Sequence, residues 1–459
     1  MTSSTTPTTA TAHRGTWRSR WTFVLATAGS AIGLGNIWKF PYMTGVNGGS
    51  AFVLVYLLCI ALVGIPLMMC EIMLGRRAQR NPVDAMAHLA KEAHASRQWC
   101  WVGLMGVLAG ILILGFYSVI AGWVLDYIVR AADGAFHGMD GAGAQQQFET
   151  FLAKPIELIL WHTLFLSVTM AVVARGLNAG LEKANIIMMP SLFAIVLVMI
   201  GYSMAVGNFA ESARFMFTPN FSLVTPTAVL SALGHAFFTL SIGMGSVMVY
   251  GSYLGRQVSI ARTTLYVALA DTAVGLLTGL AIFALAFANG LKPAAGPGLI
   301  FQTLPIAFGA MPAGNLMGVL FFILVAFAAW TSAISLVEPA IAWITENSDL
   351  TRKQAAWLIG ITNWLLGVAV ALSFNRWSNV KPVAGLNLFD LLDKLTTNIL
   401  LPLGGLAMAL FAGRVMKTAH VAEELGLGTH AYALWRFVIR YISPLAILSI
   451  FAYLLGWVT

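Results

Sequence analysis

The sequence predicts an all-α polytopic membrane protein with about eleven transmembrane helices. Its composition excludes a soluble fold: 59% of the 459 residues are hydrophobic and only 10% are charged, whereas soluble domains carry roughly 25% charged residues. The mean hydropathy is +0.81, and long apolar runs recur from end to end. Each run can cross a hydrocarbon core of about 30 Å as a helix, the form in which a single segment satisfies its own backbone polar groups in lipid.

These runs divide the chain in order. A Ser/Thr-rich tail, residues 1–16, is expected to be disordered. Five spans then lie within 17–206, five more within 227–413, and the last within 436–459. The expected spans are 21–44, 50–74, 99–131, 156–174, 185–206, 227–253, 261–288, 317–345, 354–373, 389–413 and 436–457. Two connections are long, 132–155 and 289–316, and the second is compatible with a lid or with a plain connector.

The positive charges predict the orientation of the spans. If the N-terminus is cytoplasmic, 17 of the 26 Lys and Arg residues lie on its side and five on the other. Lys and Arg are enriched on the cytoplasmic side of membrane proteins. The N-terminus is therefore expected in the cytoplasm and, with an odd number of spans, the C-terminus in the periplasm. The formal charge of +8 is then a topology signal and not a sign of nucleic-acid binding.

Several other classes of protein are disfavoured. Cys59, Cys70 and Cys100 are odd in number and lie in or beside apolar runs, which does not suit a disulfide scaffold. The sequence has no CxxC or HxxxH spacing, so a zinc or haem site is not expected. No nucleophile–base pair stands at the depth of a span, which argues against a membrane enzyme.

Glycines interrupt spans 1 and 6. Span 1 contains AGSAIGLGNIWKFP and span 6 contains FFTLSIGMGSVMVYGSY, so each has glycines among hydroxyl or amide side chains. The Gly29-xxx-Gly33 spacing is also typical of close helix packing, and that alternative stays open. We favour helices unwound at mid-membrane, because interruptions at matching positions of two halves indicate an ion-coupled transporter site.

Charged residues inside spans are costly unless they face the bundle interior. Asp126 and Arg130, spaced i, i+4, are expected to form a structural pair. Asp271 has no cation within a helical turn, so its counter-charge must come from another helix or from an ion. The other charged residues within spans are Lys39, Glu71, Glu338, Asp393 and Lys394.

Long motifs resemble the neurotransmitter:sodium symporter family. They are GSAIGLGNIWKFP, NGGSAF, LVGIPLMMCEIMLGR, FFTLSIGMGSVMVYGSY, WTSAISLVEPAIAW and RYISP, in the order of the family and across most of the chain. The resemblance implies the leucine-transporter fold, two inverted five-helix repeats in which helices 1 and 6 are unwound. The usual pattern has twelve spans, and this chain departs from it with about eleven.

The resemblance also implies two sodium ions held by oxygen atoms, which suit a hard cation. At the first site the expected ligands are Ala31, Asn36, Thr239 and Asp271, where Asp271 departs from the Asn of the family. At the second site the expected ligands are Gly29, Ile32, Ala328, Thr331 and Ser332. The hydroxyls of Thr331 and Ser332 have the alternative of bonding back to their own helix.

The departure at Asp271 bears on chloride. Relatives that require chloride hold it partly through a Ser and a Gln, and the matching positions here are Gly275 and His235. An ionised Asp271 beside sodium supplies the compensating charge itself, so no chloride requirement is expected. A protonated Asp271 that cycles during transport is the competing hypothesis. We expect His235 to be a hydrogen-bonded interior histidine.

The resemblance further implies an amino-acid substrate. Monoamine carriers of the family have an Asp in helix 1 where this chain has Gly33, which leaves room for a zwitterion whose carboxylate contacts sodium. The residues expected around it are Ser30, Ala31, Leu34, Gly35, Ile113, Tyr117, Phe238, Thr239, Ser241, Met244, Ser332 and Leu336. This apolar and adaptable lining favours a hydrophobic or aromatic amino acid. A small one such as Ala stays an alternative.

Two gates are expected by the same resemblance. Lys39 and Asp393 match the outer gate, with Lys in place of the usual Arg, so the bridge lacks a bidentate fork. The residues matching the inner gate are Arg14, Trp17 and Glu346, with Tyr253 as the brace.

The sequence therefore predicts a sodium-coupled symporter that imports an α-amino acid across a bacterial inner membrane by alternating access. Its partners are the substrate and the lipid bilayer, with no nucleic acid, and a homodimer is left open. The alternatives are a proton-coupled amino-acid permease of the same fold and an amino-acid sensor that does not transport.

Overall fold

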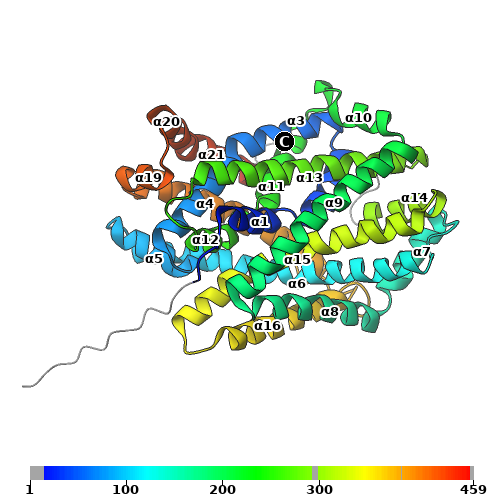
Figure 1. The fold of residues 1–459 in the computed structure, drawn as a ribbon, viewed down its shortest axis with the longest axis horizontal. Coiled ribbons are helices and arrows are strands. Elements are labelled where there is room, and N and C mark those ends of the chain that lie inside the picture. Colours follow the sequence, from blue (N-terminus) through cyan, green and yellow to red (C-terminus); the bar gives the residue numbers. More distant parts are fainter. Residues whose placement is uncertain (1–14, 292–297, 384, 455–459) are drawn as a thin grey trace, which may run out of the picture.

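The computed structural model describes residues 15–291, 298–383 and 385–454. Within these ranges the chain is helical apart from turns, loops and one isolated bridge between Val383 and Leu386. The long helices run alongside one another as a single bundle (Figure 1). Most of the expected tail 1–16, including Arg14, falls outside the described residues.

The first half of the chain supplies elements up to α10, where η marks a short 3₁₀ or π segment. They are α1 (Arg20–Ala31), η1 (Gly35–Lys39), α2 (Phe40–Val46), α3 (Ser50–Cys59), η2 (Ile60–Gly64), α4 (Ile65–Ala78), α5 (Pro82–Glu92), η3 (Arg97–Trp99), α6 (Cys100–Ala132), α7 (Gly141–Leu152), α8 (Pro155–Val173), η4 (Leu177–Glu182), α9 (Lys183–Val206) and α10 (Phe209–Phe217).

The second half supplies the remaining elements. They are η5 (Phe221–Leu223), α11 (Pro226–Thr239), α12 (Ser246–Ser252), α13 (Ile260–Ala288), η6 (Leu299–Thr303), α14 (Leu304–Ala310), α15 (Gly314–Asn347), α16 (Arg352–Leu372), α17 (Leu388–Lys394), η7 (Leu395–Leu400), α18 (Leu401–Leu410), η8 (Phe411–Val415), α19 (Thr418–Leu425), α20 (Thr429–Phe437), η9 (Val438–Ile442) and α21 (Ser443–Leu454).

Nine helices of the described chain are long and apolar enough to cross a membrane. They correspond to expected spans 2–5 and 7–11. Expected spans 1 and 6 are each divided into two shorter helices, α1 with η1–α2 and α11 with α12. The prediction of broken helices at these two positions is therefore confirmed.

The two long connections contain helices that the sequence analysis did not foresee. Asp140 caps α7 by accepting a hydrogen bond from the Gly143 amide (2.7 Å). In the second connection, η6 and α14 pack inward, and the Phe301 carbonyl accepts a hydrogen bond from the Tyr127 hydroxyl of α6 (3.0 Å). Residues 299–310 of the connection 289–316, for which a lid was considered, are thus packed against the bundle, and its residues 292–297 lie outside the described residues.

Glycines let the central helices come close enough to enclose a site. A Cβ on Gly110 of α6 would lie 2.5 Å from the Leu336 carbonyl of α15. A Cβ on Gly75 of α4 would lie 1.8 Å from the Met248 carbonyl of α12. Small residues at helix contacts are the usual means of close packing in membranes. Here they hold α6 and α15 against each other and α12 against α4.

Candidate functional site

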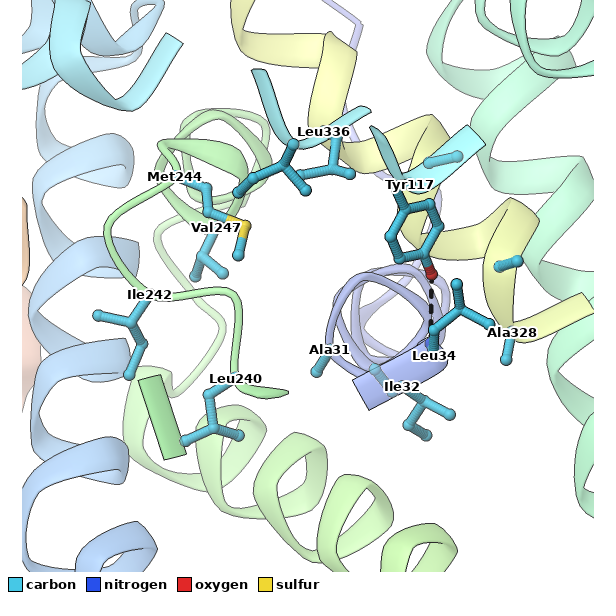
Figure 2. Packing of buried hydrophobic residues seen from close by; sticks show 14 of the residues in the cluster. Ala31, Ile32, Leu34, Tyr117, Leu240, Ile242, Met244, Val247, Ala328 and Leu336 are labelled. Carbon is cyan, nitrogen blue, oxygen red and sulfur yellow. Dashed lines mark hydrogen bonds between the residues drawn. The ribbon is translucent and has the colours of Figure 1, made fainter. Parts of the chain in front are cut away.

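The break in helix 1 exposes backbone amides at the centre of the bundle. α1 ends at Ala31, and Ile32 has extended backbone (φ −71°, ψ 101°). The amides after the break lack helical partners, as at any helix start. The Asn36 side-chain oxygen accepts from the Gly33 amide (3.0 Å), and the Tyr117 hydroxyl of α6 accepts from the Leu34 amide (3.2 Å), a bond visible in Figure 2.

The break in helix 6 is held by a buried carboxylate. Gly243 (φ 88°) and Gly245 (φ 74°) have left-handed backbone, which glycine adopts without strain. Glu71 of α4 is fully buried and accepts hydrogen bonds from the amides of Gly243 (3.2 Å) and Gly245 (3.1 Å). The sequence showed Glu71 only as a charge within a span, because nothing local indicates that helix 6 lies opposite.

The side chains expected at the first sodium site converge on Asp271 of α13. The Asn36 amide donates to Asp271 Oδ1 (2.8 Å) and the Thr239 hydroxyl donates to both carboxylate oxygens (3.0 and 3.1 Å). Tyr56 of α3 donates to Oδ2 (3.5 Å). Asp271 is fully buried, and no Lys, Arg or His of the described chain pairs with it. Ala31 is the last residue of α1 and lies on the cavity that Thr239 also lines.

His235 does not behave as expected. It is buried, yet neither ring nitrogen has a hydrogen-bond partner among the described residues. Its ring instead packs among the rings of Phe40, Phe52 and Tyr56, at centroid distances of 5.4–6.4 Å. The expectation of a hydrogen-bonded histidine was wrong, because aromatic neighbours surround the ring and no described polar group bonds to either nitrogen.

The residues expected at the second sodium site also lie together. The Ser332 hydroxyl of α15 is within 3.3 Å of the carbonyl oxygens of Gly29 and Ile32 at the end of α1. The Thr331 hydroxyl bonds back to the carbonyls of Phe327 (3.1 Å) and Ala328 (3.0 Å). Oxygen atoms from α1 and α15 therefore face one another, and Thr331 takes the back-bonded arrangement that the sequence left open.

One cavity between the two breaks is lined by every residue expected around a substrate. Its volume is about 20 Å³, room for roughly one water molecule. The hydroxyl of Ser241 donates to the Ser30 carbonyl across it (2.8 Å). The lining consists of Ser30, Ala31, Gly33, Leu34, Gly35, Ile113, Tyr117, Phe238, Thr239, Ser241, Met244, Ser332 and Leu336.

The residues expected at the outer gate are in contact beside this cavity. Lys39 Nζ is 3.7 Å from Asp393 Oδ1, and the two side chains are 25% and 33% exposed. The same ammonium lies 4.6 Å from the centroid of the Phe238 ring, which lines the cavity. Lys39 is thus bound to α17 by charge and to α11 by a cation–π contact.

Of the residues expected at the inner gate, Trp17, Tyr253 and Glu346 are described, and Arg14 is outside the described residues. The Trp17 indole donates to the Tyr250 carbonyl (3.0 Å), and Trp17 packs edge-on against Tyr253. The Tyr253 hydroxyl donates to Glu338 (2.9 Å). Glu346 accepts hydrogen bonds from the backbone and side-chain amides of Asn81 (3.1 and 2.8 Å).

The expected pair of Asp126 and Arg130 forms, and Arg130 also reaches Glu157 (3.3 Å). An ion pair between the buried Glu338 and the partly exposed Arg352 was not foreseen. Arg352 also donates to the Val173 carbonyl (2.9 Å) and so connects α16 to α8. Sequence spacing could not reveal it, because Glu338 and Arg352 belong to different helices of unknown register.

Comparison with known proteins places this geometry in a family. Residues 14–137 and 146–457 match the sodium:neurotransmitter symporter family. Relatives include YhdH of Bacillus subtilis, described as an uncharacterized sodium-dependent transporter, which is 39% identical over 444 residues covering 96% of this chain and 97% of that one. An uncharacterized sodium-dependent transporter of Haemophilus influenzae is 33% identical over 453 residues, 97% of this chain and 99% of the relative.

A solved structure agrees in both fold and sequence. The crystal structure of MhsT in complex with L-phenylalanine matches with a TM-score of 0.89 and 42% identity, over 95% of this chain and 99% of that one. The described chain shares with it the all-helical bundle. This chain belongs to the sodium:neurotransmitter symporter family, a family of sodium-dependent transporters and not of enzymes.

Proposed function

We propose that the protein is a sodium-coupled symporter that imports a hydrophobic or aromatic α-amino acid. The observation that carries the proposal is the convergence of both helix breaks, both sets of oxygen ligands and the outer gate on one cavity. Broken helices with half-helix ends at a central cavity suit a zwitterion and its coupling ions. A bacterial inner membrane and a cytoplasmic N-terminus belong to the same proposal.

The cavity supports the substrate class. The Leu34 amide, now bonded to Tyr117, is a donor placed for a carboxylate, and the carbonyls of the helix ends suit an ammonium group. Ile113, Met244 and Leu336 supply an apolar wall that can adapt, because Met has a flexible side chain. MhsT, which shares 42% of its aligned sequence with this chain, was solved with L-phenylalanine.

The size of the cavity supports transport by alternating access. Its volume of about 20 Å³ does not hold an amino acid, so α1, α6 and α11 must separate when one binds. Opening toward the outside requires the Lys39–Asp393 contact to break. A substrate carboxylate and a sodium ion that touch each other raise each other's affinity by the same factor, which couples their movement.

Two sodium ions without chloride complete the proposal. The carboxylate of Asp271 supplies a negative charge beside the first ion, and Gly275 offers no side chain to a chloride. Proton coupling is the second candidate, because Asp271 is a buried carboxylate and no described cation pairs with it.

Uptake into proteoliposomes tests this proposal. We expect concentrative uptake of labelled L-phenylalanine with an inward sodium gradient, and none with choline in its place. Asn36→Ala should abolish it, since Asn36 links the helix 1 break to Asp271. The control Asn47→Ala should leave it intact, because within the described chain the Asn47 side chain donates only to the Met43 carbonyl of the helix that it caps.

Other results would overturn parts of the proposal. Uptake driven by a proton gradient without sodium would favour the proton-coupled permease. Sodium-dependent binding of phenylalanine without uptake would favour a sensor. Uptake of alanine but not of phenylalanine would reject the large apolar substrate while leaving sodium coupling in place.

A further inference from the structure

We propose that the side-chain oxygen of Asn185 is a further ligand of the sodium ion at the second site. Asn185 lies near the start of α9, a helix that contributes none of the ligands expected from the sequence. The inference rests on the proposed function, because it assumes that the second site takes sodium.

Asn185 is a buried amide with half of its hydrogen-bonding capacity unused. It is 1% exposed, and its side-chain nitrogen donates to the Leu181 carbonyl (2.9 Å). Its Oδ1 atom has no hydrogen-bond partner among the described residues. A buried carbonyl oxygen without a partner destabilises the folded protein. A hydrogen-bond donor or a cation beside Oδ1 would remove that cost.

The oxygen lies beside two residues expected at the second sodium site, Gly29 and Thr331. It lies 2.3 Å from the position that a Cβ on Gly29 would occupy, and Thr331 Cβ lies 3.0 Å from the same position. Gly29 and Thr331 are both expected ligands, one from α1 and one from α15, and α9 packs against both helices. This contact also explains why residue 29 is glycine, because any side chain there would collide with the Asn185 amide.

Neither of the two side chains nearest to Asn185 at the Gly29 position donates to its oxygen. The Thr331 hydroxyl already donates within its own helix. The next atom in distance from the Gly29 position is the Met189 sulfur, at 3.2 Å, which carries no proton to donate. A sodium ion would satisfy Oδ1, since hard cations take amide oxygens as ligands.

A second buried asparagine has the same local bonding as Asn185 but belongs to a helix that provides none of the expected sodium ligands. Asn363 of α16 is also fully buried; its nitrogen donates to the Ile359 carbonyl one turn earlier (3.0 Å), and its Oδ1 likewise has no partner among the described residues. However, α16 provides none of the expected sodium ligands. Asn185 and Asn363 therefore have the same local bonding, and only Asn185 lies beside Gly29 and Thr331.

Direct sodium binding to the purified full-length protein tests the inference. Binding of radioactive sodium is measured without substrate, together with the rise in Tm that sodium produces, which depends on sodium affinity. We expect Asn185→Ala to raise the half-saturating sodium concentration by about tenfold. Asn363→Ala removes the same local bond and should leave that concentration unchanged.

Asn185→Asp separates an oxygen ligand from a structural amide. Aspartate keeps a side-chain oxygen but, when ionised, cannot donate to the Leu181 carbonyl. If the oxygen binds sodium, Asn185→Asp should bind sodium at least as tightly as the wild type. If Asn185 only supports α9, the Asp and Ala variants should weaken sodium binding alike.

The outcomes keep this inference apart from the proposed function. If the wild type binds sodium and Asn185→Ala binds it equally tightly, the role of Asn185 is overturned and the symporter proposal stands. Equal weakening in Asn185→Ala and Asn363→Ala would also overturn it, as a general packing effect. A wild type that binds no sodium would overturn both.

Discussion

Asp271 is the residue on which the proposed ion requirement most directly depends. Its carboxylate is buried and accepts hydrogen bonds from Asn36, Thr239 and Tyr56. Three donors stabilise an ionised carboxylate, but they carry no full positive charge. A sodium ion beside it would complete the balance, and an amide at this position would leave one positive charge uncompensated.

Asp271→Asn is therefore expected to weaken sodium binding by about tenfold or more and to make uptake depend on added chloride. The measurement is phenylalanine uptake against sodium concentration, with chloride or gluconate as the anion. Asp126→Asn is the control, since Asp126 is also buried but is paired with Arg130. If Asp271→Asn took up substrate like the wild type in gluconate, Asp271 would have no part in charge compensation.

At the scale of single residues, the sequence predicted the members of the site far better than their partners. The family resemblance assigned Asn36, Thr239 and Ser332 to the neighbourhood of the helix breaks, and the structure has all three side chains there. The sequence did not reveal Glu71 as the acceptor for helix 6, nor Asn185 as a neighbour of Gly29. Both contacts depend on which faces of distant helices meet, and no local pattern encodes that.

At the scale of helices, close packing between α4 and α12 holds one side of the helix 6 break. A Cβ on Gly75 would lie 1.8 Å from the Met248 carbonyl, a backbone atom that cannot move without displacing α12. The break itself is tied to α4 by Glu71. The α4–α12 contact therefore affects both stability and the position of the unwound segment.

Gly75→Ala is expected to destabilise the protein by about 1–3 kcal/mol, the usual cost of overpacking, and to impair uptake. Gly201→Ala is the matched control, because Gly201 is also inside a helix, α9, and a Cβ there would meet nothing within 4 Å. Its Tm should be unchanged or higher, since Ala favours helix over Gly. Equal Tm values for the two variants would show that α12 shifts freely.

The sequence predicted those helices that local patterns encode and missed those that depend on contacts with distant parts of the chain. Long apolar runs predicted the nine long helices of the described chain, and the glycine clusters predicted the two divided ones. The additional helices α7 and α14 were missed, because they lie in connections where an apolar run is too short to indicate a span. Asp140 caps α7, and the segment that leads into α14 packs on α6 through the Phe301 carbonyl.

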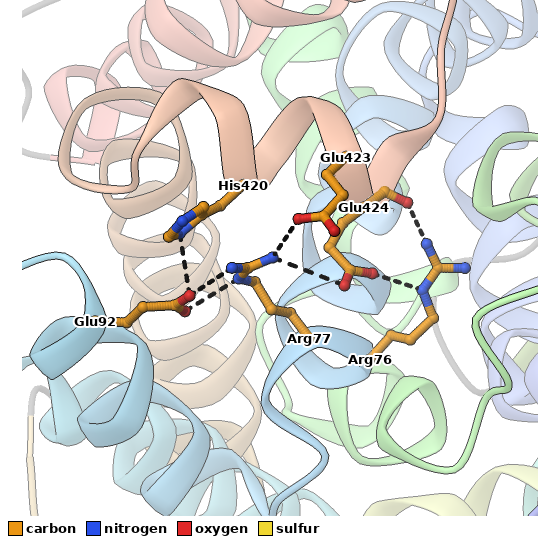
Figure 3. A network of polar contacts seen from close by, with 6 residues as sticks. All are labelled: Arg76, Arg77, Glu92, His420, Glu423 and Glu424. Carbon is orange, nitrogen blue, oxygen red and sulfur yellow. Dashed lines mark hydrogen bonds and ion pairs between the residues drawn. The ribbon is translucent and has the colours of Figure 1, made fainter.

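At the scale of the whole molecule, a polar cluster joins the two halves of the chain at one end of the bundle (Figure 3). Arg76 and Arg77 extend from the end of α4, Glu92 from α5, and Glu424 from α19. Arg76 Nε donates to Glu424 (2.8 Å), and Arg77 pairs with Glu92 and reaches Glu424 at 3.9 Å. The cluster thus fixes α19, which follows the tenth span, to helices of the first half.

The cluster makes stability depend on pH through Glu92. The hydrogen bond from Arg77 holds the pKa of the Glu92 carboxyl below its usual value, with further help from His420 and His88. A carboxyl whose pKa is lowered by folding stabilises the protein above its unfolded pKa, about 4.3, and loses that contribution as the pH falls through the lower folded value. Because the pair is partly exposed, we expect it to contribute about 0.5 kcal/mol.

Glu92→Gln should therefore lower the Tm slightly at pH 7, and the difference from the wild type should shrink as the pH falls below about 4. Thermal unfolding in detergent across this pH range measures it. Glu149→Gln is the control, because Glu149 is exposed and accepts only from Gln145 of its own helix among the described residues (2.8 Å). If the Tm difference between Glu92→Gln and the wild type persisted at acid pH, the stabilisation by Glu92 would come from the packing of its side chain and not from its charge.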